Sequence, residues 1–306
     1  MGFIQDNARR FRDFWNYLKQ FHQRGDLYFV KNKNILTKIA EDDVYHKLEL
    51  EYARLIRNSS YPTVAGKPSK KVWICWLQGE ENAPELVKAC INSVRRNLPD
   101  REVVVLTEET IPKYIQFPDY IVEKWKNKKI RAAHYSDLLR LALLCEYGGM
   151  WIDATVLCTS SDIPKAITDS PLFVYQIIDL SRHDQEAIIA SNWFISACRQ
   201  QPILMLTRDL LYEYWKRNDC AENYYIFHMF FAMAARQYPE DWKMVPVYNN
   251  HAPHTLQFEL DREYEPDRWT DILKMSVIHK LNRYIRQEEQ NPTFYRHIIE
   301  TYLEEQ

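Results

Sequence analysis

The spacing of apolar side chains changes once along the chain, near residue 60. Before this point apolar residues recur at steps of three and four across residues 3–57, which predicts helices. Residues 58–69 are rich in Pro, Gly and Ser, which favours a linker. We therefore expect an N-terminal helical extension of residues 1–61, followed by a second domain of residues 62–306.

After the linker, short apolar runs alternate with helical stretches. The runs at residues 72–77, 102–106 and 150–157 predict strands, and residues 84–97 and 132–147 predict helices between them. Strands that alternate with helices are typical of an α/β fold with a largely parallel sheet. In such sheets ligands bind beyond the carboxyl ends of the strands.

One predicted helix, residues 132–147, carries charges on an otherwise apolar surface. His134, Asp137 and Arg140 follow each other at steps of three and so share one stripe. An unpaired buried charge is costly, so these side chains need partners. A simple Asp137–Arg140 pair facing water is one interpretation. The next strand, however, delivers Asp153 near its carboxyl end, which favours a single crevice shared by Asp137, Arg140 and Asp153.

The same segment resembles a known signature. YSDLLR at residues 135–140 and YGGMWIDAT at residues 147–155 are similar to the SDxxRxxxLxxxGGxYxDxD signature of sugar-binding-region glycosyltransferases. The chain resembles the bacterial capsular polysaccharide synthesis family, related to glycosyltransferase family 32, over residues 71–284. Clostridial glucosylating toxins share the signature. The resemblance implies a GT-A fold, which is Rossmann-like with a mostly parallel sheet flanked by helices, a UDP-sugar donor and a divalent cation, Mn²⁺ or Mg²⁺.

Matched residue by residue, the resemblance assigns roles around the donor. Asp137 and Arg140 hold hydroxyls of the donor sugar, and Asp153 is the first acid of the DxD motif, in contact with ribose and metal. The second acid is replaced by Thr155. A neutral hydroxyl is a weaker ligand for a hard cation than a carboxylate, so we expect weak metal binding.

Residues 76–79, WLQG, follow the first strand, where related enzymes place uracil and ribose. Trp76 would stack on the base with Gln78 beside it, and Gly79 would let the backbone approach closely. A core tryptophan followed by a turn glycine is an equal alternative.

Three further positions are candidates. Asn192, in SNWFISA at residues 191–197, resembles the family's N-x-F-[IM]-x-A asparagine, which contacts the donor, although by chemistry alone it is a helix cap. His279 and Lys280 resemble a late His-Lys element in which the histidine completes the metal shell and the lysine meets the phosphates. His228 lies in an aromatic block and is either a core residue or a neighbour of the acceptor.

The composition limits the classes of partner and the cellular locations that we expect. The net charge of −2 offers no argument for nucleic acid, and six cysteines without a CxxC pair favour a reduced cytosolic setting. No apolar run reaches the roughly 20 residues of a membrane span. Residues 1–40, however, hold eight Lys and Arg against three Asp, a net +5, among many aromatics. This segment either lies on anionic lipid at the inner face of the cell membrane or packs onto the catalytic domain.

Together these features favour one function. We expect a glycosyltransferase that moves a hexose from a UDP-sugar to a hydroxyl of a polysaccharide or lipid-linked glycan, in capsule or cell-surface polysaccharide synthesis. The resemblance implies retention of anomeric configuration. A catalytically lapsed sugar-nucleotide-binding protein is the alternative, favoured by Thr155 alone. A nucleotidyl- or phosphotransferase would be expected to carry a glycine-rich phosphate loop, which the chain lacks.

Overall fold

The structure, a computed structural model, describes three stretches of the 306-residue chain: residues 33–177, 186–282 and 292–304. It has two compact units, divided after Tyr52. Helix α2 (Lys33–Asn58) begins in the first unit and ends in the second. The helices predicted before the linker are confirmed from residue 33 onward, whereas residues 1–32 lie outside the described part. The predicted domain boundary at residue 61 stays a prediction.

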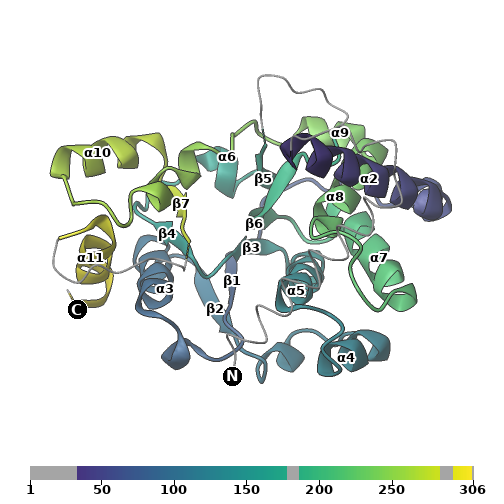
Figure 1. The fold of residues 1–306 in the computed structure, drawn as a ribbon, viewed down its shortest axis with the longest axis horizontal. Coiled ribbons are helices and arrows are strands. Elements are labelled where there is room, and N and C mark those ends of the chain that lie inside the picture. Colours follow the sequence, from purple (N-terminus) through teal and green to yellow (C-terminus); the bar gives the residue numbers. More distant parts are fainter. Residues whose placement is uncertain (1–32, 178–185, 283–291, 305–306) are drawn as a thin grey trace. The chain divides into compact units, whose positions relative to one another are not determined.

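The second unit is built on a five-stranded sheet in the order β2-β1-β3-β6-β5 (Figure 1). Its strands are β1 (Lys71–Cys75), β2 (Glu102–Leu106), β3 (Gly149–Ile152), β5 (Leu172–Gln176) and β6 (Ala190–Ala197). β1 pairs in parallel with β2 and β3, and β6 runs antiparallel to both β3 and β5. Four of the five strands therefore point the same way. The expected α/β fold with a mostly parallel sheet is confirmed.

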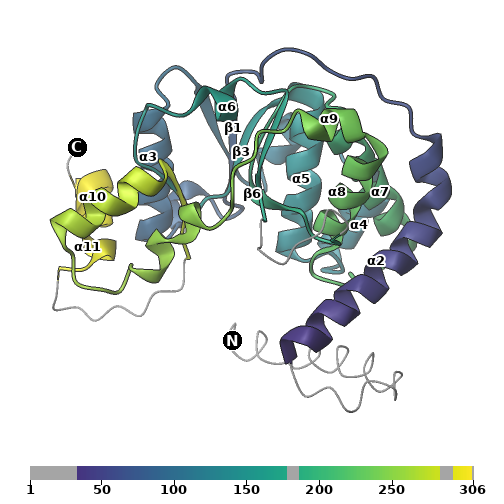
Figure 2. The ribbon, with the colours of Figure 1, turned by 90° about the horizontal axis from the view of Figure 1, so that it is seen from above.

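Helices cover both faces of this sheet (Figure 2). α3 lies on one face, whereas α5, α7 and α8 lie on the other. The longer helices of the unit are α3 (Glu85–Asn97), α4 (Asp119–Lys126), α5 (Ala132–Tyr147), α7 (Pro202–Arg217), α8 (Ile226–Gln237) and α10 (Pro266–Met275). Shorter ones in the described ranges are α6 (Lys165–Thr168), α9 (Pro239–Lys243), α11 (Phe294–Ile299), four 3₁₀ turns and a π turn after α11. None of the helices in this part of the chain is long and apolar enough to cross a membrane.

The predicted strand at residues 150–157 is wrong in one respect, because it is two strands. β3 ends at Ile152, a turn takes residues 153–155, and β4 (Val156–Cys158) then leaves the sheet. The Val156 amide donates to the Asp153 carbonyl at 3.0 Å and closes the turn. β4 pairs antiparallel with β7 (Ile278–Lys280), a strand from late in the chain. A continuous apolar run in the sequence does not reveal such a turn.

Two glycines make the sharp passage from α5 into β3. Gly148 and Gly149 have φ of 64° and 99°, a region that side chains rarely tolerate. A Cβ on Gly149 would strike the Lys71 carbonyl of β1, and one on Gly148 would lie 2.8 Å from the Arg199 amide nitrogen. The buried Trp73 indole also donates to the Gly148 carbonyl, at 3.0 Å. The pair therefore lets the turn between α5 and β3 pack closely against Lys71 and Arg199, at the start of the strand that leads to Asp153.

Candidate functional site

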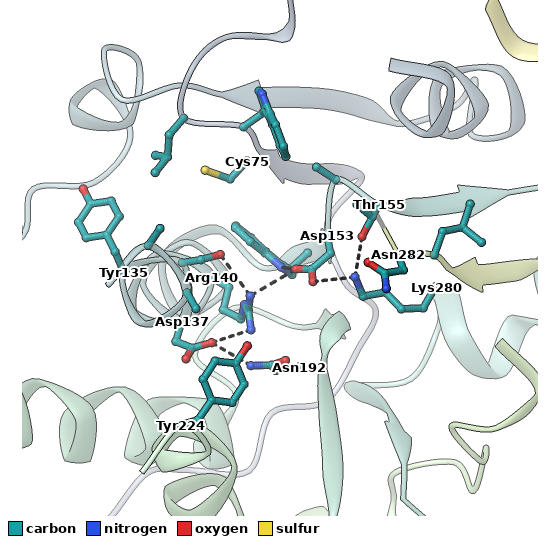
Figure 3. Close-up of a pocket in the computed structure, with 18 of the residues that line it drawn as sticks. Cys75, Tyr135, Asp137, Arg140, Asp153, Thr155, Asn192, Tyr224, Lys280 and Asn282 are labelled. Carbon is teal, nitrogen blue, oxygen red and sulfur yellow. Dashed lines mark hydrogen bonds and ion pairs between the residues drawn. The ribbon is translucent and has the colours of Figure 1, made fainter. Parts of the chain in front are cut away.

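A pocket of about 590 Å³ opens at the carboxyl ends of β1 and β3 (Figure 3). This is the edge at which ligands bind in parallel α/β sheets, and the volume lies in the ordinary range for a ligand site. Most of the predicted site residues line it: Trp76, Gln78, Asp137, Arg140, Asp153, Thr155, Asn192, His228 and Lys280. The structure thus brings together side chains that lie far apart in the sequence.

Asp137 projects from α5 into this pocket and is buried, with 6% of its surface exposed. Its Oδ1 accepts hydrogen bonds from Arg140 Nη1 at 2.7 Å and from Asn192 Nδ2 at 2.8 Å. Burial alone would raise the pKa of the carboxyl, but Arg140 and His134 outweigh it and lower that pKa. Asp137 is therefore a charged acceptor held in place by its neighbours.

Arg140 lies between two carboxylates. Besides Asp137, its guanidinium reaches the Ser136 hydroxyl at 3.2 Å and Asp153 Oδ1 at 3.3 Å. The rings of Trp151 and Phe227 lie 5.1 Å and 5.7 Å from its central carbon, at cation–π distance. Arg140 is only 4% exposed, so the interpretation of a simple pair facing water is wrong.

Asp153 is paired on both of its oxygens. Oδ1 also accepts from the Trp151 indole nitrogen at 2.9 Å, and Oδ2 lies 3.5 Å from Lys280 Nζ. The same ammonium donates to Thr155 Oγ1 at 2.6 Å. Asp137, Arg140, Asp153 and Lys280 therefore form a chain of alternating charge that crosses the floor of the pocket (Figure 3).

The β4–β7 pair places Lys280 in this position. In its register Lys280 faces Val156, directly after the turn that holds Asp153 and Thr155. The Leu281 amide then donates to the Thr155 carbonyl at 2.9 Å. Because side chains alternate along a strand, Lys280 and its neighbour His279 point to opposite faces.

His279 is consequently outside the pocket and does not lie with Asp153 and Thr155, so its place in the metal shell stays a prediction. The imidazole is fully buried opposite Leu157, and its Nε2 lies 3.4 Å from the Thr159 hydroxyl. Burial lowers its pKa to about 4, although a backbone contact to Ser276 opposes this. Within the described ranges, no cluster of three or more His, Cys, Asp or Glu could hold a metal ion.

Residues 76–79 follow β1, and only some of them reach the pocket. Trp76 and Gln78 line the pocket, and the Trp76 ring also packs against the apolar cluster under α3. Trp76 thus contacts the core and also lines the pocket, so neither interpretation of this residue excludes the other. Gly79 lies outside the pocket, and its φ of 87° belongs to the turn that leads to Glu80–Asn82.

His228, on α8, lines the pocket and is 9% exposed. Burial, together with the Arg140 charge, lowers its pKa to about 4, and the Asp137 charge opposes this only in part. Its ring is therefore neutral near pH 7. Tyr225 packs edge-on to it at 5.3 Å, and the neighbouring Tyr224 is 59% exposed at the mouth.

Some pocket residues were not predicted from the sequence. Trp151 and Ser136 hold Arg140 and Asp153, and Tyr224 and Asn282 line the rim. Trp151 and Ser136 stand inside the recognised signature, so their proximity to it was the available signal. Asn192 lies within strand β6, so the helix-cap alternative is wrong.

Known proteins resemble the chain over different lengths. An O-glycosyltransferase, braB, from Annulohypoxylon truncatum is 29% identical over 171 residues, which are 52% of this chain and 40% of that protein. The match thus spans less than half the length of this relative. A solved structure titled PaToxG Glycosyltransferase matches 78% of this chain and 95% of its own, with 16% identity and a TM-score of 0.42. Another, the structure of a transferase mutant, matches 63% of this chain and 95% of its own, with 10% identity and a TM-score of 0.32.

The match to a protein family is much longer than the match to the individual relative. The family described as Capsular polysaccharide synthesis protein matches residues 24–298, which include all the residues that line the pocket. The chain therefore belongs to the capsular polysaccharide synthesis protein family.

Proposed function

We propose that this protein is a glycosyltransferase that uses the pocket to bind a UDP-sugar and transfers its hexose to a hydroxyl of a glycan or lipid-linked glycan. The observation that carries the proposal is the convergence of Asp137, Arg140, Asp153, Asn192 and Lys280 in one pocket at the carboxyl edge of the sheet. Family membership and the O-glycosyltransferase relative support the same class of reaction.

The geometry suggests how the donor would lie. The Asp137 carboxylate and the Asn192 amide offer an acceptor and a donor for sugar hydroxyls. Trp76 and Gln78 stand at the end of β1, where a base and ribose would contact them. Arg140 and Lys280 supply the positive charge that a departing diphosphate requires.

The carboxylates of the pocket favour transfer without a covalent intermediate. Asp137 is bonded to Arg140 and Asn192, and both oxygens of Asp153 face cations. A carboxylate engaged in this way is a poor nucleophile. We therefore favour retention by front-face attack, in which the leaving phosphate takes the proton of the acceptor hydroxyl. His228, neutral and near Tyr224 and Tyr225, would contact the acceptor.

The divalent cation implied by the family signature fits these residues poorly. Of its predicted ligands, Asp153 is paired with two cations, Thr155 is neutral and hydrogen-bonded to Lys280, and His279 points away. Hard cations prefer several anionic oxygens. No step of the proposed reaction is therefore assigned to a metal.

Incubation with a panel of UDP- and GDP-sugars, followed by mass spectrometry of the released nucleotide, tests the proposal. UDP should raise the melting temperature more than GDP or ADP, and Asp153→Ala should abolish turnover while the protein stays folded. A larger shift with GDP would refute the UDP assignment. Stabilisation by UDP without turnover on any donor would instead favour the catalytically lapsed binding protein.

A further inference from the structure

We infer that Lys280, held by Thr155, takes the place of the divalent cation in this pocket, so that donor binding does not depend on a metal. The inference rests on the proposed function, because it concerns the diphosphate of the donor. In this arrangement the Lys280 ammonium faces the diphosphate, and the Thr155 hydroxyl holds the ammonium in position.

The first observation is the position of the ammonium. Lys280 Nζ lies 2.6 Å from Thr155 Oγ1 and 3.5 Å from Asp153 Oδ2. It therefore sits between the two side chains of the D-A-T segment that would ligate a metal. A divalent ion placed there would have to displace the ammonium or lie beside a like charge, which is unfavourable.

The second observation is the charge balance. Among the described residues, the pocket floor holds two carboxylates, Asp137 and Asp153, and two cations, Arg140 and Lys280, so its formal charge is zero. It has no excess negative charge to attract a divalent ion. A carboxylate at residue 155 would supply that excess, whereas the threonine hydroxyl accepts a hydrogen bond from the ammonium and leaves its positive charge in place.

The third observation is that the backbone holds this arrangement. The Leu281 amide, next to Lys280, donates to the Thr155 carbonyl at 2.9 Å, and the adjoining β4–β7 register pairs Lys280 with Val156, next to Thr155. The lysine side chain is only 21% exposed and reaches the pocket from this strand. A cation fixed in advance loses little conformational freedom when the diphosphate arrives, which favours binding.

The test measures UDP binding by calorimetry, in excess EDTA and in excess Mn²⁺. For the unaltered protein we expect the two dissociation constants to agree within about twofold. Lys280→Met should raise the dissociation constant in EDTA by about 10- to 100-fold, the loss expected for a charge-assisted bond. Lys280→Arg should keep most of the affinity. The matched control is Lys274→Met, an exposed lysine on α10 outside the pocket, which should bind UDP unchanged.

A double variant, Thr155→Asp with Lys280→Met, tests whether metal-dependent binding can be created in the same pocket. It removes the ammonium and creates the missing carboxylate, so UDP binding should recover with Mn²⁺ by at least about tenfold relative to EDTA. Circular dichroism of every variant confirms that it is folded.

The possible outcomes separate the two proposals. If the unaltered protein binds UDP in Mn²⁺ and its affinity for UDP falls by at least about tenfold in EDTA, the lysine inference is overturned and the proposed function stands. Wild-type affinity in Lys280→Met would also overturn the inference. If UDP binds under neither condition, the UDP-sugar assignment fails, and the lysine inference fails with it.

Discussion

At the scale of single residues, Arg140 connects the two carboxylates that line the pocket. It lies between Asp137 at 2.7 Å and Asp153 at 3.3 Å, and the rings of Trp151 and Phe227 lie at cation–π distance from it. Such a buried cation is tolerated because its charge is matched, and each carboxylate in turn depends on it. The arginine therefore holds both carboxylates in place and helps to lower the pKa of Asp137.

Replacing this arginine should destabilise the whole unit. Arg140→Met leaves Asp137 without its nearest cation, and breaking a buried ion pair of this kind costs about 3–5 kcal/mol. Arg199→Met is the control, because Arg199 pairs with Glu146 at 2.9 Å on the surface and such a pair contributes at most about 1 kcal/mol. Urea unfolding of both variants gives the comparison. Equal losses would show that the Arg140 charge is not needed for stability.

At the scale of elements, the β4–β7 pair decides which side chains enter the pocket. Its register sends Lys280 toward Asp153 and sends His279 to the opposite, buried face. A buried imidazole has to stay neutral, and burial lowers the pKa of His279 to about 4. The ionisation of this histidine is thus coupled to the stability of the strand that carries the lysine.

The coupling predicts a pH dependence of stability. The pKa of His279 is lower in the folded protein than in the unfolded chain, so the unfolded chain binds the proton more readily. The contribution of His279 to the free energy of unfolding is therefore fully present above the unfolded pKa of about 6.5 and is lost as the pH falls toward 4. The difference of about 2.5 pKa units sets an upper bound on the order of 3 kcal/mol.

His279→Asn removes this proton and should flatten the stability profile between about pH 6.5 and 4, when unfolding is followed by urea titration at each pH. His251→Asn, at an exposed loop histidine, is the control and should follow the unaltered protein. Burial also lowers the pKa of His228 to about 4, so part of the pH dependence of stability remains in both variants. A profile in His279→Asn as steep as that of the unaltered protein would contradict the coupling.

At the scale of the whole molecule, charge is unevenly distributed along the chain. Residues 1–40 have a net charge of +5 in a protein whose total is −2, and most of this segment lies outside the described residues. An enzyme that extends a lipid-linked glycan would benefit from a basic, aromatic segment that holds it near anionic lipid. The membrane contact and the inner-face location stay predictions.

Vesicle co-sedimentation tests the contact. The full chain should bind vesicles that contain anionic lipid and be released at high salt, because salt screens surface attraction. Substituting glutamine for Arg9, Arg10 and Arg12 should weaken the binding without loss of fold, whereas Arg95→Gln, on α3 in the second unit, should leave it unchanged. Failure of the unaltered protein to sediment with these vesicles would exclude the membrane interpretation.

Features that depend on local pattern were predictable from the sequence. Apolar spacing predicted α5 and β2 at their observed bounds, and the signature located Asp137, Arg140 and Asp153. Local pattern is sufficient here because periodicity depends only on residues that are close in the sequence, and the same holds for a contiguous motif.

The way in which distant segments meet is visible only in the folded chain. The fold split the predicted strand into β3 and β4, paired β4 with a strand from late in the chain, and thereby sent Lys280 into the pocket and His279 out of it. A shift of one residue in that register would exchange the two side chains. The register depends on packing between segments that no local pattern connects, so the pairing of Asp153 with Lys280 could be found only in the folded chain.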